Sequence, residues 1–313
     1  MIGRGATILV TGAAGLIGSA VCRELLARGS RVVACDDFSI GLWREERAGL
    51  AWEDLDVADA GAAARIAAHA PAGVVHCAAH PGGKSLQEPS DDARVNALGS
   101  MRVFEACARA RIPVVYLSSS AVYGEQPPAP IREDAPLAPG TVYAVCKVAC
   151  EGFLRVLADG YGLPWTVLRL FATYGAGHRP SAHQGIVNVM LTQLQAGGEV
   201  VVRGSLDRVR DLLYVDDAAR AVAGCLLEPS TRGRVLNVGT GAGLTVREII
   251  HALASLLGRR PGDVVIREEA GTVGDPRYSV ADVSQLAALG LKPRLGAAEG
   301  LAALVEARRK VAA

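Results

Sequence analysis

The stretch Thr7-Ile8-Leu9-Val10-Thr11-Gly12-Ala13-Ala14-Gly15-Leu16-Ile17-Gly18-Ser19 decides how the rest of the chain is organised. Its first five residues predict a short buried strand, and three glycines spaced three apart follow directly. Glycine permits a sharp turn from strand to helix, lets a ligand approach the backbone and allows close packing of helix on strand. Backbone N–H groups at the start of that helix favour a phosphate, so the stretch predicts a pyrophosphate site.

The residues that follow supply the support that a glycine triplet alone lacks. Apolar residues at helical spacing run up to Gly29, and Arg31–Cys35 predicts a second buried strand. Asp36 ends that strand, about twenty residues after the glycines, where dinucleotide folds place the carboxylate that binds the adenosine ribose. A carboxylate there repels a 2′-phosphate, so we expect NAD rather than NADP. The alternative is that Asp36 only forms a turn with Asp37.

Composition and charge exclude several classes of protein. The chain has 313 residues, of which 50% are hydrophobic and 21% charged, and its net charge is +1. These values are typical of a globular protein, and they argue against general attraction to nucleic acid or to a membrane surface. No apolar run reaches the length of a membrane span, and the first strand begins too early to leave room for a signal peptide. We therefore expect a cytoplasmic protein.

The cysteines and histidines give no sign of a metal site. The seven cysteines are scattered without a Cys-x-x-Cys pair, and no histidines stand near them at zinc-binding spacing. His76 and His80 are four apart, but they fall on a predicted strand and on the loop after it. We therefore expect mostly buried thiols and no bound metal.

The order of predicted elements indicates an α/β fold of the Rossmann type, with a doubly wound parallel sheet. Up to about residue 170 strands alternate with helices; the strands are expected at 7–11, 31–35, 50–52, 73–78, 114–118 and 165–170, and the helices at 16–28, 59–69, 91–110 and 143–160. Beyond Phe171 the pattern changes to loops rich in Gly, Pro and Arg over 175–180, helices near 186–196, 217–227, 245–257 and 297–310, and short strands at 199–203, 235–238 and 264–267. We therefore predict an NAD-binding domain over 1–171 and a smaller α/β substrate lobe over 172–313, with some exchange of chain and a cleft between them.

Tyr143 and Lys147 lie near the start of a predicted helix, and their spacing of four puts both on one helical face. A free tyrosine is a poor base at neutral pH, but a lysine cation and the positive nicotinamide ring both favour the phenolate. The lysine can also hold the nicotinamide ribose. Such pairs also occur on ordinary solvated helices, and only the dinucleotide fold ahead of this one favours a catalytic role.

Three serines, Ser118, Ser119 and Ser120, follow the fifth predicted strand. Groups at the carboxyl ends of strands line the ligand crevice of an open α/β sheet. A serine there can hydrogen-bond a substrate oxygen and pass a proton to the tyrosine. The alternative, a polar turn after a strand, explains one serine more readily than three.

Together these motifs resemble those of the extended short-chain dehydrogenase/reductases that act on nucleotide sugars, most closely the epimerases of the UDP-glucose 4-epimerase type. The resemblance covers nearly the whole chain and rests on Thr11-Gly-x-x-Gly-x-x-Gly18, Asp36, Val75-His76-Cys77-Ala78-Ala79, Asn96, Ser118-Ser119-Ser120-Ala121-Val122-Tyr123-Gly124, Tyr143-x-x-x-Lys147, Arg169-Leu170-Phe171-x-x-Tyr174-Gly175, Arg210-Asp211, Tyr214-Val215-Asp216-Asp217 and Asn237-Val238-Gly239-Thr240-Gly241. It implies a Rossmann fold, a retained NAD and a nucleotide-sugar substrate, with a UDP-hexose expected.

The resemblance implies a role for each matching residue. Tyr143 is the base that takes a proton from a sugar hydroxyl, Lys147 positions the ribose and favours the phenolate, and Ser119 shares the substrate oxygen. The implied NAD-binding residues, with Asp56 on the adenine amino group, are Gly12, Ala14, Gly15, Leu16, Ile17, Gly18, Asp36, Asp37, Phe38, Ser39, Asp56, Val57, Cys77, Ala78, Ala79, Asn96, Leu117, Ser118, Tyr143, Lys147 and Phe171. The implied substrate-binding residues are Lys84, Ser119, Ser120, Tyr143, Ala172, Thr173, Asn188, Arg210 and Arg277, with Arg210 as the diphosphate clamp.

The residues after Ser119 favour epimerisation over the other reactions of the family. Members that dehydrate the sugar carry an Asp-Glu pair directly after the catalytic Thr or Ser, and members that decarboxylate carry a Glu two residues after it. This chain has Ser120 and Ala121 there, and neither can act as the additional acid or base. Inversion at C4 needs only Tyr143, Lys147, Ser119 and a retained NAD.

Two positions depart from the family's pattern for binding the substrate diphosphate. Ala172 stands where an asparagine is usual, and Thr272 stands where a second arginine is usual. Thr173, Arg277 or Arg267 are the candidates to compensate. The nucleotide and the sugar therefore stay open.

Two alternatives to an epimerase remain. A 4-ketosugar reductase on the same scaffold would consume added NADH or NADPH, and a sensor that binds NAD without chemistry would not need Ser119, Tyr143 and Lys147.

The helices at 91–110 and 143–160 carry many apolar residues, which burial within the monomer partly explains. The resemblance favours a homodimer packed through these two helices.

Overall fold

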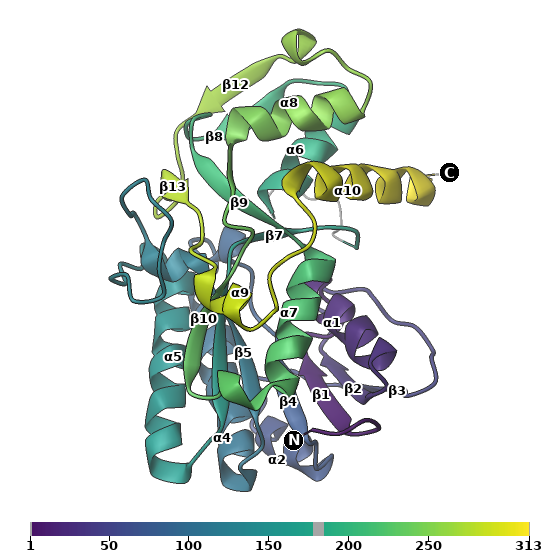
Figure 1. The fold of residues 1–313 in the computed structure, drawn as a ribbon, viewed down its shortest axis with the longest axis vertical. Coiled ribbons are helices and arrows are strands. Elements are labelled where there is room, and N and C mark those ends of the chain that lie inside the picture. The colour runs from purple at the N-terminus through teal and green to yellow at the C-terminus, as the bar shows by residue number, and fades with distance from the viewer. Residues whose placement is uncertain (1, 178–184, 313) are drawn as a thin grey trace.

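The structure is a computed structural model that describes residues 2–177 and 185–312. A seven-stranded parallel sheet forms the lower half of the molecule in Figure 1. Its order is β10-β6-β5-β4-β1-β2-β3, the doubly wound arrangement that the sequence predicted. The strands are β1 (Thr7–Thr11), β2 (Arg31–Asp36), β3 (Leu50–Asp54), β4 (Gly73–His76), β5 (Val114–Ser119), β6 (Trp165–Leu170) and β10 (Arg234–Val238).

Helices cover both faces of this sheet. On one face α1 (Leu16–Ala27) packs beside α7 (Val215–Leu227), and on the other lie α2 (Ala62–Ala68), α4 (Ser100–Ala110) and α5 (Val142–Tyr161) (Figure 1). Strands β1, β4 and β5 are almost entirely buried, because helices shield them from both sides. Both faces are therefore filled by apolar side chains, as expected for a parallel sheet.

Two segments from the second half of the chain belong to this layered unit. The strand expected at 235–238 in the smaller lobe is β10, which pairs in parallel with β6 at the edge of the main sheet. Helix α7 packs beside α1 on one face of the same sheet. The apolar pattern of a strand indicates that it is buried but not which sheet it joins, so only an exchange of chain could be predicted.

The helix expected at 91–110 is interrupted. The structure has α3 (Pro89–Asp92), a π-helical segment η2 (Ala93–Gly99) and then α4. Within η2 the carbonyl of Asn96 accepts hydrogen bonds from Ser100 Oγ at 2.7 Å and Cys150 Sγ at 3.0 Å. These side chains satisfy a carbonyl that the wider helical turn presents, and π-helical segments of this kind often lie at functional sites.

The smaller lobe lies above the main sheet in Figure 1. Strands β7 (Ala172–Tyr174), β9 (Val209–Tyr214), β11 (Gly243–Thr245) and β13 (Tyr278–Ser279) form one sheet, and β8 (Val200–Arg203) pairs with β12 (Ile266–Glu269). Helices α6 (Ile186–Gln195), α8 (Val246–Leu256), α9 (Ser284–Ala288) and α10 (Ala297–Ala312) complete the second half of the chain. The expected loop at 175–180 lies partly outside the described residues. One cluster of buried apolar side chains continues from the main sheet into this lobe.

No helix within the described ranges combines the length and the apolar character that crossing a bilayer requires.

Candidate active site

A cleft of about 1310 Å³ lies between the two lobes. Its walls include Gly12 after β1, Asp36 at the end of β2, Cys77 after β4 and Ser119 at the end of β5. All are at carboxyl ends of parallel strands, where open α/β sheets bind their ligands. Residues of β8, β9 and the segment before β13 line the other side.

The glycine-rich turn between β1 and α1 has no room for side chains. Gly12 has a φ of +65°, and a Cβ there would lie 2.5 Å from the backbone nitrogen of Ala78. A Cβ on Gly18 would lie 2.0 Å from the carbonyl oxygen of Gly12. Helix α1 begins after Gly15 with no side chain capping its N-terminus, so its first N–H groups can serve an anion.

Asp36 joins this turn to the loop that follows β2. Its carboxylate accepts one hydrogen bond from the N–H of Ala14 at 2.9 Å and one from the N–H of Phe38 at 2.8 Å. Burial raises the pKa of Asp36 above its usual value, against the opposing effect of the two N–H donors. The loop also crosses the glycine turn, because the N–H of Trp43 donates to the carbonyl of Ala14 at 3.2 Å.

Asp56 is engaged by protein groups on both carboxylate oxygens. Oδ1 accepts from the N–H of Ala58 at 2.7 Å, and Oδ2 accepts from Arg94 at 2.7 Å. Burial acts to raise the pKa of Asp56, but the hydrogen bond from Arg94 and the Ala58 N–H outweigh it and hold that pKa below its usual value. Each oxygen has a second lone pair with which to meet a ligand.

Thr141 starts the helix that carries the tyrosine and the lysine. Its hydroxyl accepts from the N–H of Ala144 at 3.1 Å, which caps α5 and leaves Tyr143 and Lys147 one turn apart at the cleft. Lys147 is only 3% exposed, and its ammonium donates to the carbonyl of Leu117 at 2.8 Å. The same nitrogen lies 5.4 Å from the centroid of the Tyr143 ring. The end of β5, which includes Leu117 and Ser119, therefore holds the Lys147 ammonium near the Tyr143 ring.

The loop after β4 packs against Tyr143 from the other side. Ser85 Oγ accepts from the N–H of Tyr143 at 2.9 Å, and a Cβ on Gly82 would lie 3.2 Å from the tyrosine ring. The backbone of His80 is held by Asn96, which accepts from its N–H and donates to its carbonyl. Asn96 therefore acts on the cleft through this loop rather than at its surface.

A buried ion pair supports the serine strand from behind. Ser118 Oγ donates to Glu151 at 2.7 Å, and Arg169 binds both oxygens of the same carboxylate at 3.0 and 2.7 Å. Burial opposes the charge of Arg169, but the bonds to Glu151 hold its pKa above the usual value. The ion pair holds Ser118 in place. It thereby also fixes the end of β5, from which the chain continues into the turn after Ser119.

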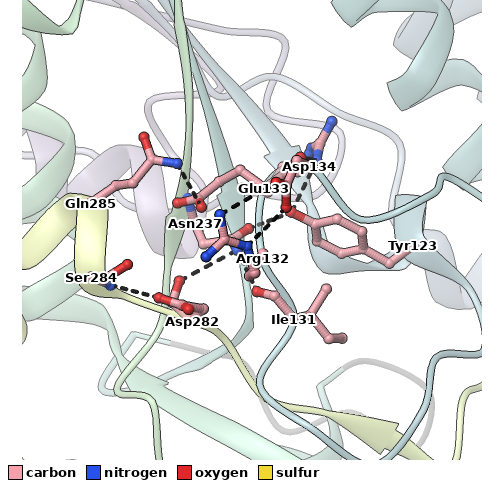
Figure 2. Close-up of polar contacts among 10 residues, drawn as sticks. Tyr123, Ile131, Arg132, Glu133, Asp134, Asn237, Asp282, Ser284 and Gln285 are labelled. Carbon is pink, nitrogen blue, oxygen red and sulfur yellow. Dashed lines mark hydrogen bonds and ion pairs between the residues drawn. The ribbon is translucent and has the colours of Figure 1, made fainter.

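A polar cluster anchors the long loop between Ser119 and Tyr143 (Figure 2). Tyr123 donates to Asn237 Oδ1 at 2.6 Å, and Asn237 donates in turn to the carbonyl of Ile131 at 2.8 Å. Glu133 accepts from the N–H of Asn237 at 3.0 Å and from Gln285 at 2.8 Å. Burial raises the pKa of Tyr123 to about 12, so its hydroxyl stays a donor. The loop is thereby tied to β10 and α9.

A second buried chain of hydrogen bonds connects β1 with η2. Ser100 Oγ donates to the carbonyl of Asn96, so it accepts from Nε2 of His76 at 2.9 Å. Nδ1 of His76 then accepts from Thr11 Oγ1 at 2.6 Å, and Thr11 Oγ1 accepts from the N–H of Ala78 at 3.3 Å. Burial, with the charge of Lys147, lowers the pKa of His76 to about 3. His76 is therefore a neutral structural residue beneath the glycine turn.

Arg210 reaches the opposite end of the cleft together with Arg208. Arg210 Nη2 donates to Asp275 Oδ1 at 2.5 Å, and Arg208 Nη1 donates to Asp275 Oδ2. Burial lowers the pKa of both guanidinium groups, and the charge of Arg208 adds to the effect on Arg210, whose pKa falls to about 10. With a pKa of about 10, Arg210 stays positively charged near neutral pH.

The cleft brings together most, but not all, of the residues that the sequence singled out. The predicted residues on its walls are Gly12, Ala14, Gly15, Leu16, Ile17, Gly18, Asp36, Asp37, Ser39, Asp56, Val57, Cys77, Ala78, Ala79, Lys84, Leu117, Ser118, Ser119, Ser120, Tyr143, Lys147, Phe171, Ala172, Thr173 and Arg210. Asn96 and three others, Phe38, Asn188 and Arg277, are not among the lining residues.

Each of these three has another environment. Phe38 packs against Trp52 with ring centroids 5.5 Å apart, Asn188 is buried and contacts Arg308 of α10, and Arg277 is exposed beside Glu125. Conversely, sequence reasoning missed Arg208, Asp275 and Glu151. For Arg208 a signal existed, because residues two apart at a strand, here Arg208 and Arg210, point to the same face.

Comparisons with known proteins agree with this geometry. The sequence model of the "NAD dependent epimerase/dehydratase family" matches residues 8–239. UDP-glucose 4-epimerase of Mycolicibacterium smegmatis is 35% identical over 309 residues, covering 95% of this chain and 97% of that protein. The structure of UDP-glucose 4-epimerase of Thermotoga maritima with UDP-glucose has a TM-score of 0.92 at 31% identity, covering 98% and 100% of the two chains. That of the Thermus thermophilus UDP-glucose 4-epimerase with NAD has a TM-score of 0.90 at 32% identity, covering 97% and 99%.

Proposed function

The chain belongs to the NAD-dependent epimerase/dehydratase family, with NAD as its cofactor, and from that premise we propose that it inverts C4 of a UDP-hexose through a transient 4-keto sugar. The observation that carries the proposal is the wall formed by Ser119, Tyr143 and Lys147. In the turn directly after Ser119, positions 120 and 121 are serine and alanine, so no carboxylate stands there for dehydration or decarboxylation.

The residues at the cofactor end fit a dinucleotide. The glycine turn leaves a cradle that a Cβ at Gly12 or Gly18 would disturb, and uncapped N–H groups of α1 suit a pyrophosphate. Each carboxylate oxygen of Asp36 accepts one backbone N–H and retains a lone pair for a ribose hydroxyl. NAD held by these residues would supply a hydride acceptor and donor next to the sugar.

The chain's own residues hold and move the proton. Tyr143 takes the proton from the 4-hydroxyl as the carbonyl forms and gives it back in the second half of the reaction. Lys147 keeps a positive charge near the phenol, because its ammonium is fixed on the carbonyl of Leu117. Ser119 donates a hydrogen bond to the sugar oxygen. Inversion requires the 4-keto sugar to present its other face before the hydride returns.

We further propose a homodimer formed through α5 and the η2–α4 helix. Many of the apolar residues on these helices, such as Phe104 and Leu154, are fully buried within the monomer. Leu98, Val145 and Val156 remain 47%, 51% and 69% exposed, and a partner's helices would cover them. Gel filtration should give the mass of a dimer, and elution as a monomer at micromolar concentration would contradict this part.

The test is turnover of a panel of nucleotide sugars by the purified protein. We expect bound NAD, interconversion of C4 epimers of one UDP-hexose pair, and no consumption of added NADH or NADPH. Stoichiometric consumption of reduced cofactor would instead indicate a 4-ketosugar reductase. A protein that binds NAD but turns over no UDP-, dTDP- or GDP-sugar would contradict the proposal and favour a sensor.

A further inference from the structure

Two arginines share one carboxylate at the end of the cleft opposite the glycine turn. The side chains of Arg208 and Arg210 are only 9% and 8% exposed, whereas that of Asp275 is 30% exposed. Each guanidinium donates to a different oxygen of Asp275. Two buried cations thus share one directly bonded carboxylate, while Glu268 and Glu125 act on Arg208 and Arg210 only at longer range. Burial of both guanidinium groups costs free energy that a bound anion would offset.

Both guanidinium groups keep donors for a ligand. Arg208 Nε donates to the carbonyl of Ser205 at 2.9 Å, and Arg210 Nη1 donates to the carbonyl of Val209 at 2.8 Å. Arg208 Nη2 and Arg210 Nε find no acceptor within the described part of the chain. A guanidinium presents its five N–H donors in a rigid fork that matches phosphate oxygens.

The fold holds the two side chains in place before any ligand arrives. Gly204, with a φ of +92°, lies against Arg208, and a Cβ there would be 2.9 Å from the guanidinium carbon. The buried carboxylate of Asp211, next to Arg210, accepts from the N–H groups of Thr240, Gly241 and Ala281, which fixes the start of β9. A preorganised pair of cations loses little freedom on binding an anion.

Among the described residues, the other arginines on this side of the cleft are more exposed and have acidic neighbours. Arg267 is half-exposed and paired with Glu199 at 2.8 Å and Glu269 at 2.5 Å, while Arg203 lies 4.0 Å from Glu269. Arg277 does not line the cleft. Neither Arg267 nor Arg277, the candidates from the sequence, therefore offers a buried unmatched charge.

We propose that Arg208 is a second phosphate-binding residue, so that Arg208 and Arg210 grip the diphosphate of the substrate together and take over the contacts missing at Ala172 and Thr272. This rests on the proposed function. Asp275 contacts both guanidinium groups, and the diphosphate would compete with it for their donors. The site therefore selects a nucleoside diphosphate over a nucleoside monophosphate.

The test is calorimetric titration of the NAD-containing protein with UDP and dTDP, and with UMP as the monophosphate probe. The Arg208→Gln variant should bind the diphosphate about 10- to 100-fold more weakly, the loss expected for a charge-assisted hydrogen bond. Its affinity for UMP should change by less than about threefold, because one phosphate engages Arg210 alone. The matched control is Arg247→Gln, a half-exposed arginine of the same lobe outside the cleft wall, with unchanged binding.

A folding defect is separated from a binding defect by NAD content and melting temperature, which Arg208→Gln should keep. Arg208→Lys retains the charge but not the fork, and it should bind diphosphate with intermediate affinity. Wild-type affinity for UDP and dTDP in both variants would overturn the inference, as would an equal loss for UMP. If the wild type turns over no nucleotide sugar but Arg208 still controls diphosphate binding, the proposed function fails and this inference stands. If the wild type turns over a nucleotide sugar and Arg208→Gln has the same kcat/KM, the proposed function stands and the role of Arg208 fails.

Discussion

The two ends of the cleft offer a phosphate group different kinds of hydrogen-bond donor. At the proposed cofactor end the donors are backbone N–H groups around Gly12, Gly15 and Gly18, and no lysine or arginine side chain belongs to the turn. At the proposed substrate end the donors are the guanidinium groups of Arg208 and Arg210, which both contact Asp275. The first end depends on the absence of side chains and the second on buried charge.

The difference suits two ligands with different residence times. A backbone cradle fixed by the fold is always formed, which fits a cofactor that stays bound through each turnover. A pair of cations with an internal counter-ion can exchange that partner for the ligand and take it back, which fits a substrate that must leave. The catalytic wall of Ser119, Tyr143 and Lys147 lies along the cleft between these binding groups.

The largest expected effect comes from removing the hydroxyl of Tyr143, the proposed proton carrier, while leaving both ends of the cleft unchanged. Tyr143→Phe should lower kcat by about 10³-fold, within the range for loss of a general base, while NAD and UDP affinities stay within about twofold. Tyr161→Phe, an exposed tyrosine on the same helix, is the control and should behave as wild type. If Tyr143→Phe kept substantial activity, another group would have to carry the proton.

The next largest effect is expected from a substitution that disrupts only the cofactor end of the cleft. Gly18→Ala places a Cβ 2.0 Å from the carbonyl oxygen of Gly12, where neither backbone can yield freely. We expect the protein to be purified without NAD and to lose about 2 kcal/mol of unfolding free energy, a typical cost of overpacking. Diphosphate binding should persist at the other end. Gly61→Ala, with open space around its Cβ, should retain NAD, and NAD retention by Gly18→Ala would contradict the account.

The two ends also differ in how well the sequence predicted them. The glycine turn, Asp36 and the Tyr143–Lys147 pair were predictable, because each depends on local spacing within one strand–turn–helix unit or one helical turn. The doubly wound parallel class of the sheet followed from the alternation of strands and helices. The joining of β10 to the main sheet did not, since pairing partners far apart in the chain leave no mark in local periodicity.

The substrate end depends on contacts between distant segments. Arg208, Arg210 and Asp275 meet only because β9 and the segment before β13 come together, and Arg208 was missed. Asn188 and Arg277 were predicted on motif position alone and do not line the cleft, Asn188 because its amide contacts Arg308 of α10. Likewise, Asn96 was expected at the cofactor, but the π-helical segment directs it to the backbone of His80.

A smaller effect should appear in the free energy of unfolding at acidic pH, because of the buried His76 beneath the glycine turn. The pKa of His76 is about 3 in the folded protein, against about 6.5 for an unperturbed histidine, so below about pH 6.5 the unfolded state binds a proton that the folded state does not. Stability is therefore lost as the pH falls. At about pH 5 this histidine should cost about 2 kcal/mol relative to pH 7.5. Denaturant unfolding of His76→Gln should show a pH dependence shallower by that amount, and an equal dependence would contradict the buried neutral state.

The smallest effect concerns Asp36, which must be ionised to accept two ribose hydroxyls. Because burial raises the pKa of Asp36 above its usual value, NAD should begin to dissociate on acidification before ordinary aspartates titrate. The NAD retained after desalting at a series of pH values measures this. Asp36→Asn should bind NAD more weakly and without that pH dependence. If the amount of retained NAD stayed constant down to the pH at which ordinary carboxyl groups titrate, the role of the Asp36 carboxylate in binding the ribose would be contradicted.

In the proposed reaction one hydride leaves C4 of the sugar and returns to C4 of the same sugar. The most direct measurement is turnover of a UDP-hexose deuterated at C4, followed by mass spectrometry and NMR of both epimers. We predict that the deuterium stays at C4 in substrate and product, with no reduced cofactor released and no exchange with solvent. Loss of the deuterium from the sugar, or a reaction that stops unless NADH or NADPH is added, would contradict the account.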